Sequence, residues 1–191
     1  SGVPVIAPDY GRIGLATRHV GDGDLVDAGP WRFTVIDIPG HTRSHIAFHG
    51  YDLDGTGLLF CGDTLFSLGC GRMFEGTPAQ MHASLQRLAA LPAETRVCCG
   101  HEYTLANAAF AIAVDPANGA LRKRADTVRE LRAAGRSSLP SMLEDERGCN
   151  PFLRCNDPAV HAAAETHAGH PLASPPEVFA TLRRWKDGFR G

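Results

Sequence analysis

Trp31-Arg32-Phe33-Thr34-Val35-Ile36-Asp37-Ile38 alternates apolar and polar side chains and runs directly into Pro39-Gly40-His41-Thr42. The alternation predicts a β-strand with one buried face, which Pro39 and Gly40 end. Further strands and turns are predicted outward from it along the chain: strands at residues 46–48, 58–61 and 96–99, and turns at residues 21–24 and 52–55, the second a hairpin tip.

Helices are predicted by caps and by apolar spacing. Thr77-Pro78-Ala79-Gln80 forms a capping box ahead of a helix that Pro92 ends. Beyond residue 103 the chain is alanine-rich and helical. Four helices are expected there: residues 105–114, residues 121–134, one opened by Asp157-Pro158, and one after a second capping box at Ser174-Pro175-Pro176-Glu177. The sequence thus predicts a β-rich α/β part over residues 1–103 and an all-helical part over residues 104–191.

Composition bounds the class of protein. The chain has 191 residues, of which 43% are hydrophobic and 21% charged, as in ordinary globular proteins. The 19 basic and 21 acidic side chains give a net charge of −2, so no global basic field exists to hold a nucleic acid or an anionic membrane. No run approaches the ~18 apolar residues of a membrane span. We expect a monomer that recognises anions only locally.

The cysteines predict a reducing compartment. The six are Cys61, Cys70, Cys98, Cys99, Cys149 and Cys155. None forms a Cys-x-x-Cys pair, and a chain of this length with a proper core needs no disulfide framework. Reduced, mostly buried thiols and a cytoplasmic location are therefore expected.

Polar residues follow glycine at the ends of three predicted strands, in Pro39-Gly40-His41-Thr42, Gly62-Asp63-Thr64 and Gly100-His101-Glu102. Ligands collect at the carboxyl ends of strands in α/β sheets. Two histidines and one aspartate brought together there would form a metal-binding set. Histidines in turns are more often surface residues, and an aspartate can cap a turn, so spacing alone does not decide.

Six motifs in order resemble the glyoxalase II family, the hydroxyacylglutathione hydrolases of the metallo-β-lactamase superfamily. They are Pro39-Gly40-His41-Thr42, residues 59–66, Gly69-Cys70-Gly71-Arg72 with Phe74-Glu75-Gly76-Thr77, residues 99–104, Asn150-Pro151-Phe152-Leu153-Arg154, and Arg183-Arg184-Trp185-Lys186-Asp187. The resemblance runs from about Val3 to Phe189. It implies the C-terminal part of a metallo-β-lactamase αβ/βα sandwich, followed by a helical glutathione-binding domain.

The resemblance also implies a centre of two divalent metal ions. His41 would bind one ion, His101 the other, and Asp63 would bridge them. Zinc is the first expectation, although iron and manganese suit the same ligands. A hydroxide held by the metals would attack a thioester carbonyl, with no other catalytic residue needed because a thiolate leaves readily. The implied reaction converts S-D-lactoylglutathione to glutathione and D-lactate, in methylglyoxal detoxification.

A glutathione pocket is implied around Arg72, Phe74 and Tyr103, completed by Arg183 and Lys186 of the last helix. Arg183 and Lys186 are three residues apart and share a helix face, where they suit the carboxylates of glutathione. Phe74 stands where some family members have tyrosine.

The remaining histidines are assigned no chemistry. His45 is expected to be structural or to support His41. Surface positions are expected for His19, His49, His82, His161, His167 and His170.

The family's His-x-His-x-Asp-His signature, which supplies four further metal ligands, does not occur in this sequence. We therefore expect the chain to be a fragment that binds metal poorly by itself, or to have the first part of its fold supplied elsewhere. Two rival functions follow: a glutathione-persulfide dioxygenase with one iron, and a non-catalytic glutathione-binding module. Measuring the metal content would show whether the chain binds metal. Oxygen consumption on a persulfide would indicate the dioxygenase, and glutathione binding without thiol release would indicate the binding module.

Overall fold

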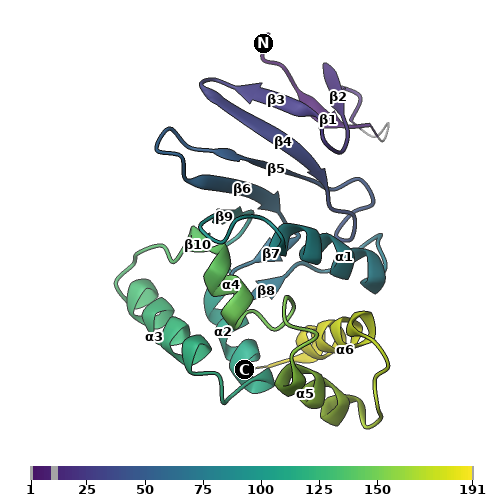
Figure 1. Ribbon diagram of the computed structural model, residues 1–191, viewed down its shortest axis with the longest axis vertical. Helices are drawn as coiled ribbons and strands as arrows, with labels where there is room; N and C mark the ends of the chain where they lie inside the picture. The colour runs from purple at the N-terminus through teal and green to yellow at the C-terminus, as the bar shows by residue number, and fades with distance from the viewer. Residues whose placement is uncertain (1, 10–12, 191) are drawn as a thin grey trace.

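The computed structural model describes residues 2–9 and 13–190 (Figure 1). Its strands are β1 Ile6–Pro8, β2 Arg18–Val20, β3 Leu25–Ala28, β4 Trp31–Asp37, β5 Ile46–Tyr51, β6 Gly57–Gly62, β7 Leu65–Phe66, β8 Gly69–Cys70, β9 Arg96–Cys99 and β10 Ser141–Met142. Its helices are α1 Pro78–Ala89, α2 Thr104–Val114, α3 Gly119–Ala133, α4 Leu143–Cys149, α5 Pro158–Ala168 and α6 Pro175–Gly188. The mixed α/β class expected from the sequence is confirmed.

The main sheet has the strand order β10-β9-β6-β5-β4-β3. Neighbouring strands are antiparallel except β6 and β9, which run parallel and are joined through α1. All four strands predicted from the sequence are members of this sheet, and the turn at residues 52–55 connects β5 to β6 as a hairpin. The short pairs β1–β2 and β7–β8 form two small separate sheets that the sequence did not predict.

Side-chain caps explain where α1, α3 and α5 begin, whereas α2, α4 and α6 begin without a side-chain capping hydrogen bond. Thr77 Oγ1 accepts a hydrogen bond from the Gln80 N–H at 3.2 Å, and Gln80 Oε1 accepts one from the Thr77 N–H at 2.9 Å, so the first capping box is confirmed. The second is wrong, because the Ser174 side chain makes no capping hydrogen bond. The Glu177 carboxylate instead accepts a hydrogen bond from the N–H of Ala173, one residue too early for a box.

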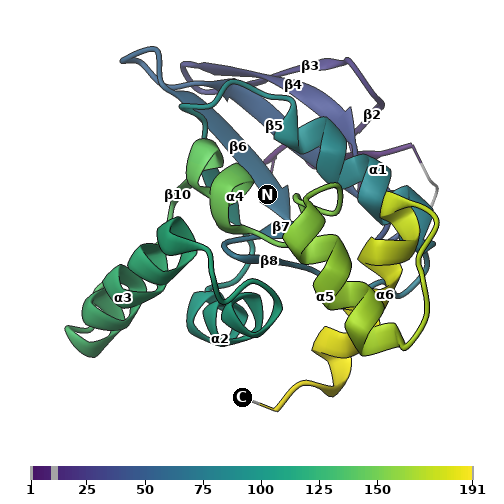
Figure 2. The ribbon, with the colours of Figure 1, turned by 60° about the horizontal axis from the view of Figure 1, so that its bottom comes forward.

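One continuous core joins the sheet to the helices. Buried Leu59 and Val97 of the sheet belong to the same cluster as Phe110 of α2 and Phe179 of α6. Figures 1 and 2 show α2 to α6 gathered beside one end of the sheet, while α1 lies across it. The division into residues 1–103 and 104–191 stays a prediction. The strand β10 belongs to the main sheet although it comes from the second part.

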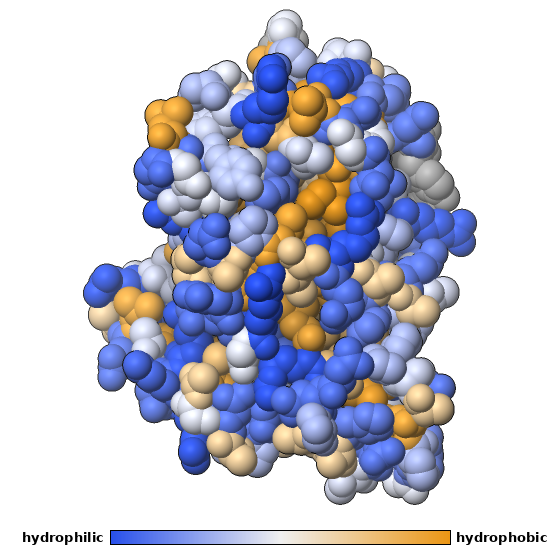
Figure 3. All heavy atoms as spheres, viewed as in Figure 1, coloured by the Kyte–Doolittle hydropathy of each residue, from blue (hydrophilic) through white to orange (hydrophobic). Residues whose placement is uncertain are grey.

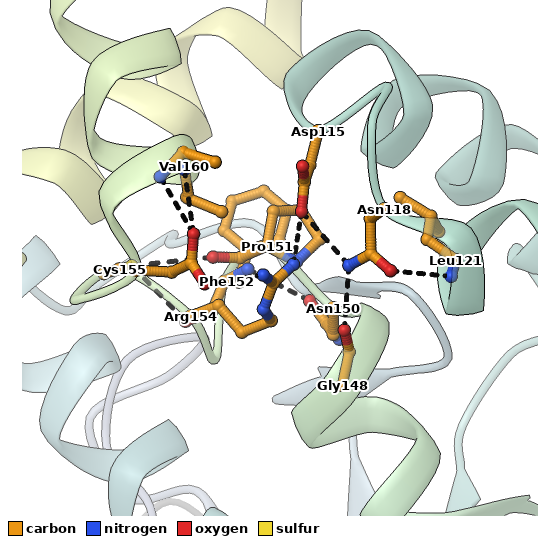
Figure 4. A network of polar contacts seen from close by, with 12 residues as sticks. Asp115, Asn118, Leu121, Gly148, Asn150, Pro151, Phe152, Arg154, Cys155 and Val160 are labelled. Carbon is orange, nitrogen blue, oxygen red and sulfur yellow. Dashed lines mark hydrogen bonds and ion pairs between the residues drawn. The ribbon is translucent and has the colours of Figure 1, made fainter.

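The irregular segment at residues 150–155 ties the helices together (Figure 4). Arg154 forms ion pairs with Asp115 at 2.5 Å and with Asp157 at 2.7 Å. Asn118 donates hydrogen bonds to Asp115 Oδ2 and to the Gly148 carbonyl oxygen. The ends of α2 and α4 and the starts of α3 and α5 are thereby held around one polar network.

The prediction that most of the thiols are buried is confirmed for Cys61, Cys70, Cys149 and Cys155, and within the described residues all six cysteines are free. Burial raises the pKa of the Cys70 thiol to about 11, although the nearby Arg183 opposes the shift. Among the described residues, no helix has the length and apolarity needed to cross a membrane.

The surface shows where apolar groups remain in contact with solvent. Figure 3 shows an oblique band of apolar residues across the face of the molecule seen in Figure 1, with hydrophilic residues on both sides. Phe60, whose ring meets Phe33 edge-on at 5.6 Å, is 43% exposed on β6.

The surface prediction for His82 is wrong: this residue is 9% exposed on α1, because its ring packs against Phe179 of α6.

Candidate active site

Three strand-end loops bring His41, Asp63 and His101 together. Because β4 and β5 are antiparallel and β5 and β6 are antiparallel, β4 runs in the same direction as β6, and β9 is parallel to β6. The carboxyl ends of β4, β6 and β9 therefore meet at one edge of the sheet. Asp63 Oδ2 lies 3.6 Å from His41 Nε2 and 3.5 Å from His101 Nε2.

Glycines allow the loops to approach this closely. Gly62, which precedes Asp63, has φ of +49°, a conformation that most other residues adopt only with strain. A Cβ atom on Gly71 would collide with the Asp63 carbonyl oxygen, and one on Gly100 would collide with Asp63 Oδ1. The backbone around Asp63 thus leaves no room for side chains at these two positions.

Hydrogen bonds orient the imidazole of His41. Its Nδ1 lies 2.8 Å from the Arg72 carbonyl oxygen, which can only accept, so Nδ1 donates this hydrogen bond and Nε2 is the ring nitrogen that faces Asp63. The half-buried His45 lies behind it, with Nδ1 2.7 Å from Thr64 Oγ1. Burial, and secondarily the neighbouring His41, lower the pKa of His45, which favours its neutral form.

The donor set fits part of a metal centre. The distances from Asp63 Oδ2 to His41 Nε2 and to His101 Nε2 are longer than a hydrogen bond. They match the separation of two ligand atoms on one tetrahedral ion, which is about 3.4 Å when each atom is bound at about 2.1 Å. His41 with Asp63 could thus contribute to holding one ion, and His101 with Asp63 could contribute to holding another. Within residues 2–9 and 13–190, no group of three or more His, Cys, Asp or Glu side chains is arranged to hold a metal ion. His41, Asp63 and His101 lie close together, but by themselves they do not make up a complete metal site.

A cavity of about 630 Å³ opens beside this cluster. His41 and Asp63 line one end of it, whereas His101 is outside the lining. All five residues predicted to contact glutathione line the cavity: Arg72, Phe74, Tyr103, Arg183 and Lys186. The structure therefore brings together residues from the β-rich part and from α6.

Aromatic rings form the walls nearest the histidines. The Tyr103 ring stacks on His101 with centroids 5.2 Å apart and meets Phe66 edge-on at 5.3 Å. The Phe74 ring lies 5.0 Å from that of His41. An extended ligand in the cavity would thus lie against flat apolar surfaces close to Asp63.

The three cations of the cavity are held differently. The Arg72 side chain is 69% exposed. Lys186 Nζ donates a hydrogen bond to the Ala106 carbonyl oxygen at 2.9 Å and lies 5.3 Å from the centre of the Phe110 ring. Burial lowers the pKa of Lys186, and Arg183 lowers it further. Arg183 itself is only 6% exposed, and its Nη1 donates to the Cys70 carbonyl oxygen.

The loop that carries His101 and Tyr103 is anchored by the residue between them. Glu102 Oε1 accepts hydrogen bonds from the N–H and the hydroxyl of Ser138, both at 2.7 Å, and Oε2 lies 3.3 Å from Arg132. The bonds from Ser138 hold the pKa of Glu102 below its usual value. The carboxylate therefore stays charged and keeps the loop attached to the segment after α3.

Sequence reasoning missed several residues that line the cavity. They are Phe66, Cys70, Gly71, Ala106, Asn107, Asp187 and Phe189. Only Asp187 had a readable signal, since it follows Arg183 by four residues, the spacing of an ion pair on a helix. The others lie there because of tertiary packing.

The fold and this site define a member of the metallo-β-lactamase superfamily, whose family model matches residues 8–101. A second model, "Hydroxyacylglutathione hydrolase C-terminus", matches residues 102–189. The chain is 58% identical over 183 residues to a hydroxyacylglutathione hydrolase of Xanthomonas campestris pv. campestris, covering 96% of this chain and 70% of that protein. It is 57% identical over 187 residues to one of Xylella fastidiosa, covering 98% and 70%. The chain belongs to the hydroxyacylglutathione hydrolase family, the metal-dependent thioester hydrolases also called glyoxalase II.

A solved structure supports the fold. The crystal structure of ETHE1 from Myxococcus xanthus superimposes with a TM-score of 0.57 at 24% identity, covering 96% of this chain and 65% of that one. At this identity the likeness concerns the fold alone.

Proposed function

We propose that this protein hydrolyses S-D-lactoylglutathione to glutathione and D-lactate. The observation that carries the proposal is the position of the cavity: Asp63, which lies between the Nε2 atoms of His41 and His101, lines the same cavity as Arg72 and Lys186. A peptide thioester bound among the cations would extend its acyl group toward His41, Asp63 and His101.

The cluster would hold the divalent metal ions on which the family depends. We assign His41 to one ion, His101 to the other and Asp63 to both, with zinc, iron and manganese all compatible with these ligands. A bound cation would polarise the thioester carbonyl and lower the pKa of water. The Arg72 carbonyl, through His41 Nδ1, fixes the imidazole in the orientation that presents Nε2.

The other residues bind and orient the substrate. Arg72 and Lys186 offer positive charge to the two carboxylates of glutathione, and Arg183 adds positive charge to the wall. The rings of Phe74 and Tyr103 confine the peptide next to the histidines. The leaving thiol has an ordinary pKa of about 8.5 and departs as thiolate with little help, so no general acid is assigned.

Two other functions differ in how far the site and the family match support them. A glutathione-persulfide dioxygenase is less well supported, because residues 102–189 match the hydroxyacylglutathione hydrolase C-terminus. A glutathione-binding protein without catalysis is favoured by one observation: among the described residues, no group of three or more His, Cys, Asp or Glu side chains could hold a metal ion.

The test is the release of free thiol from S-D-lactoylglutathione with added zinc, iron(II) or manganese(II). We expect release well above the rate in buffer with the same metal. Release no faster than buffer, with glutathione binding intact, would select the binding protein. Oxygen consumption on glutathione persulfide without thioester hydrolysis would select the dioxygenase.

A further inference from the structure

Asp187 connects two arginines of the glutathione cavity. It lies in the last turn of α6 and is, with Asp63, one of two carboxylates among the residues that line the cavity. Its Oδ1 accepts a hydrogen bond from Arg183 Nη2 at 3.0 Å and lies 3.6 Å from Arg72 Nε. A single oxygen atom thus links α6 to the loop that follows β8.

Arg183 is engaged by the protein itself. Its Nη1 donates to the Cys70 carbonyl oxygen at 2.9 Å, its Nη2 donates to Asp187, and its guanidinium lies 5.3 Å from the centre of the Phe152 ring. With a side chain only 6% exposed, it cannot present a two-nitrogen fork to a ligand without breaking these contacts. Arg183 therefore fixes Asp187 in place rather than meeting the ligand face-on.

Arg72 is the cation that this arrangement leaves accessible. Its side chain is 69% exposed, and a long exposed side chain loses much conformational freedom when it binds. The Asp187 carboxylate restricts that freedom by attracting the guanidinium toward the cavity. Because the contact is loose, Arg72 can still donate to a carboxylate that arrives.

We propose that Asp187 is a positioning residue for glutathione recognition: anchored by Arg183, it holds Arg72 where a ligand carboxylate meets it. The proposal rests on the proposed function, because the ligand is a glutathione thioester or its glutathione product. Asp187 touches neither the thioester nor the metal ligands in this assignment, so it affects binding rather than the chemical step.

The direction in which glutathione affinity changes when Asp187 is substituted distinguishes the positioning role from a purely electrostatic effect. Replacing Asp187 by Asn makes the cavity more positive by one charge, which by Coulomb attraction alone would tighten the binding of anionic glutathione. If Asp187 instead positions Arg72, the same substitution weakens binding, because the side chain must be ordered when the ligand binds.

The experiment is calorimetric titration of the whole chain with glutathione and with glutathione diethyl ester, in which both carboxylates are blocked. Variants are Asp187→Asn, Asp187→Glu and Arg72→Gln. Glu130→Gln, which removes the same charge from an exposed site on α3, is the matched control. We expect Asp187→Asn to weaken glutathione binding about tenfold. Asp187→Glu should recover most of the affinity, and Glu130→Gln should leave it within about twofold.

The ester and the double variant separate positioning from general damage to the fold. Wild type and Asp187→Asn should bind the ester equally, and Asp187→Asn should weaken binding less in the Arg72→Gln background. Unchanged or tighter glutathione binding by Asp187→Asn overturns the inference while leaving the proposed function standing. An equal loss for the ester also overturns it, because a structural defect would act on both ligands. Wild type that binds no glutathione overturns the proposed function and the inference together.

Discussion

The carboxyl group of Glu146 on α4 accepts a hydrogen bond from the backbone N–H of Leu68, 2.7 Å away, although 78 residues separate the two in the sequence. Leu68 lies in the turn between β7 and β8 with φ of 59°, a left-handed conformation that is unusual for leucine. The residues after this turn, Cys70 to Arg72, form a wall of the cavity beside Asp63. A buried acid far from the cavity thus helps to shape it.

Substituting Glu146 by Gln should stabilise the protein at neutral pH. Glu146 is fully buried and its desolvation raises the pKa, so the folded state holds the proton that the unfolded state releases above about pH 4.3. Wild-type stability should therefore fall as the pH rises above that value, whereas Gln keeps an acceptor for Leu68 and carries no charge. Urea unfolding at pH 5 and pH 8 measures this.

The free energy of unfolding of Glu146→Gln, taken relative to that of wild type, should be larger at pH 8 than at pH 5 by about 1 kcal/mol or more. Glu146→Leu, which removes the acceptor, should be destabilising at both values because Leu68 N–H is left unpaired. If Glu146→Gln and wild type lost equal free energy of unfolding between pH 5 and pH 8, the raised pKa of Glu146 would be contradicted.

Asn150→Ala should loosen the same hairpin. Asn150 Nδ2 donates to the carbonyl oxygens of Phe66 and Gly69, and its Oδ1 accepts from the Phe152 N–H. Loss of these buried bonds should cost about 2–4 kcal/mol in unfolding free energy. Asn156→Ala, at an exposed site in the same segment, should change stability by less than about 0.5 kcal/mol. Equal effects at the two sites would rule out this role.

Gly71→Ala should disrupt the candidate active site, because the new Cβ would collide with the backbone carbonyl oxygen of Asp63. We expect a loss of at least about 2 kcal/mol, together with reduced glutathione affinity. Gly148→Ala is the control, since no atom lies within 4 Å of its added Cβ and the residue is inside α4. It should be neutral or stabilising by about 0.5–1 kcal/mol, and a Gly71→Ala variant equally well folded would count against the close packing described.

His82 should make the protein sensitive to acid. Burial lowers the pKa of His82, so below the unfolded-state value of about 6.5 the unfolded chain takes up a proton that the folded state resists. The stabilising effect of the neutral ring is complete above that value and is lost as the pH falls. His82→Phe should lose less stability than wild type between pH 7.5 and 5.5 in thermal melts. His170→Gln, at an exposed site, should behave as wild type, and parallel pH profiles for all three would refute the prediction.

The sequence was informative where local chemistry decides the structure. The alternation in residues 31–38 and the capping box at Thr77 predicted β4 and α1. Glycine before a polar residue at three strand ends made His41, Asp63 and His101 candidates, although that pattern alone did not decide that they form a site. These features depend on neighbours in the sequence, so they can be read without tertiary structure.

What the sequence could not predict depends on distant contacts. The two-residue strands β7 and β8 are fixed by Asn150 and Glu146, about 80 residues away, and carry no pattern of their own. The burial of Arg183 arises from the Cys70 carbonyl oxygen, which lies 113 residues earlier. His82 is buried only because α6 packs on α1.

We assign to Asp63 a role in the chemical step, at the end of the cavity that would bind glutathione. This role is tested most directly by comparing wild type with Asp63→Asn for thiol release from S-D-lactoylglutathione with added divalent metal, and for glutathione affinity by calorimetry. Asp63→Asn should abolish thiol release and metal uptake while glutathione affinity stays within about twofold of wild type. Normal thiol release by Asp63→Asn would contradict it.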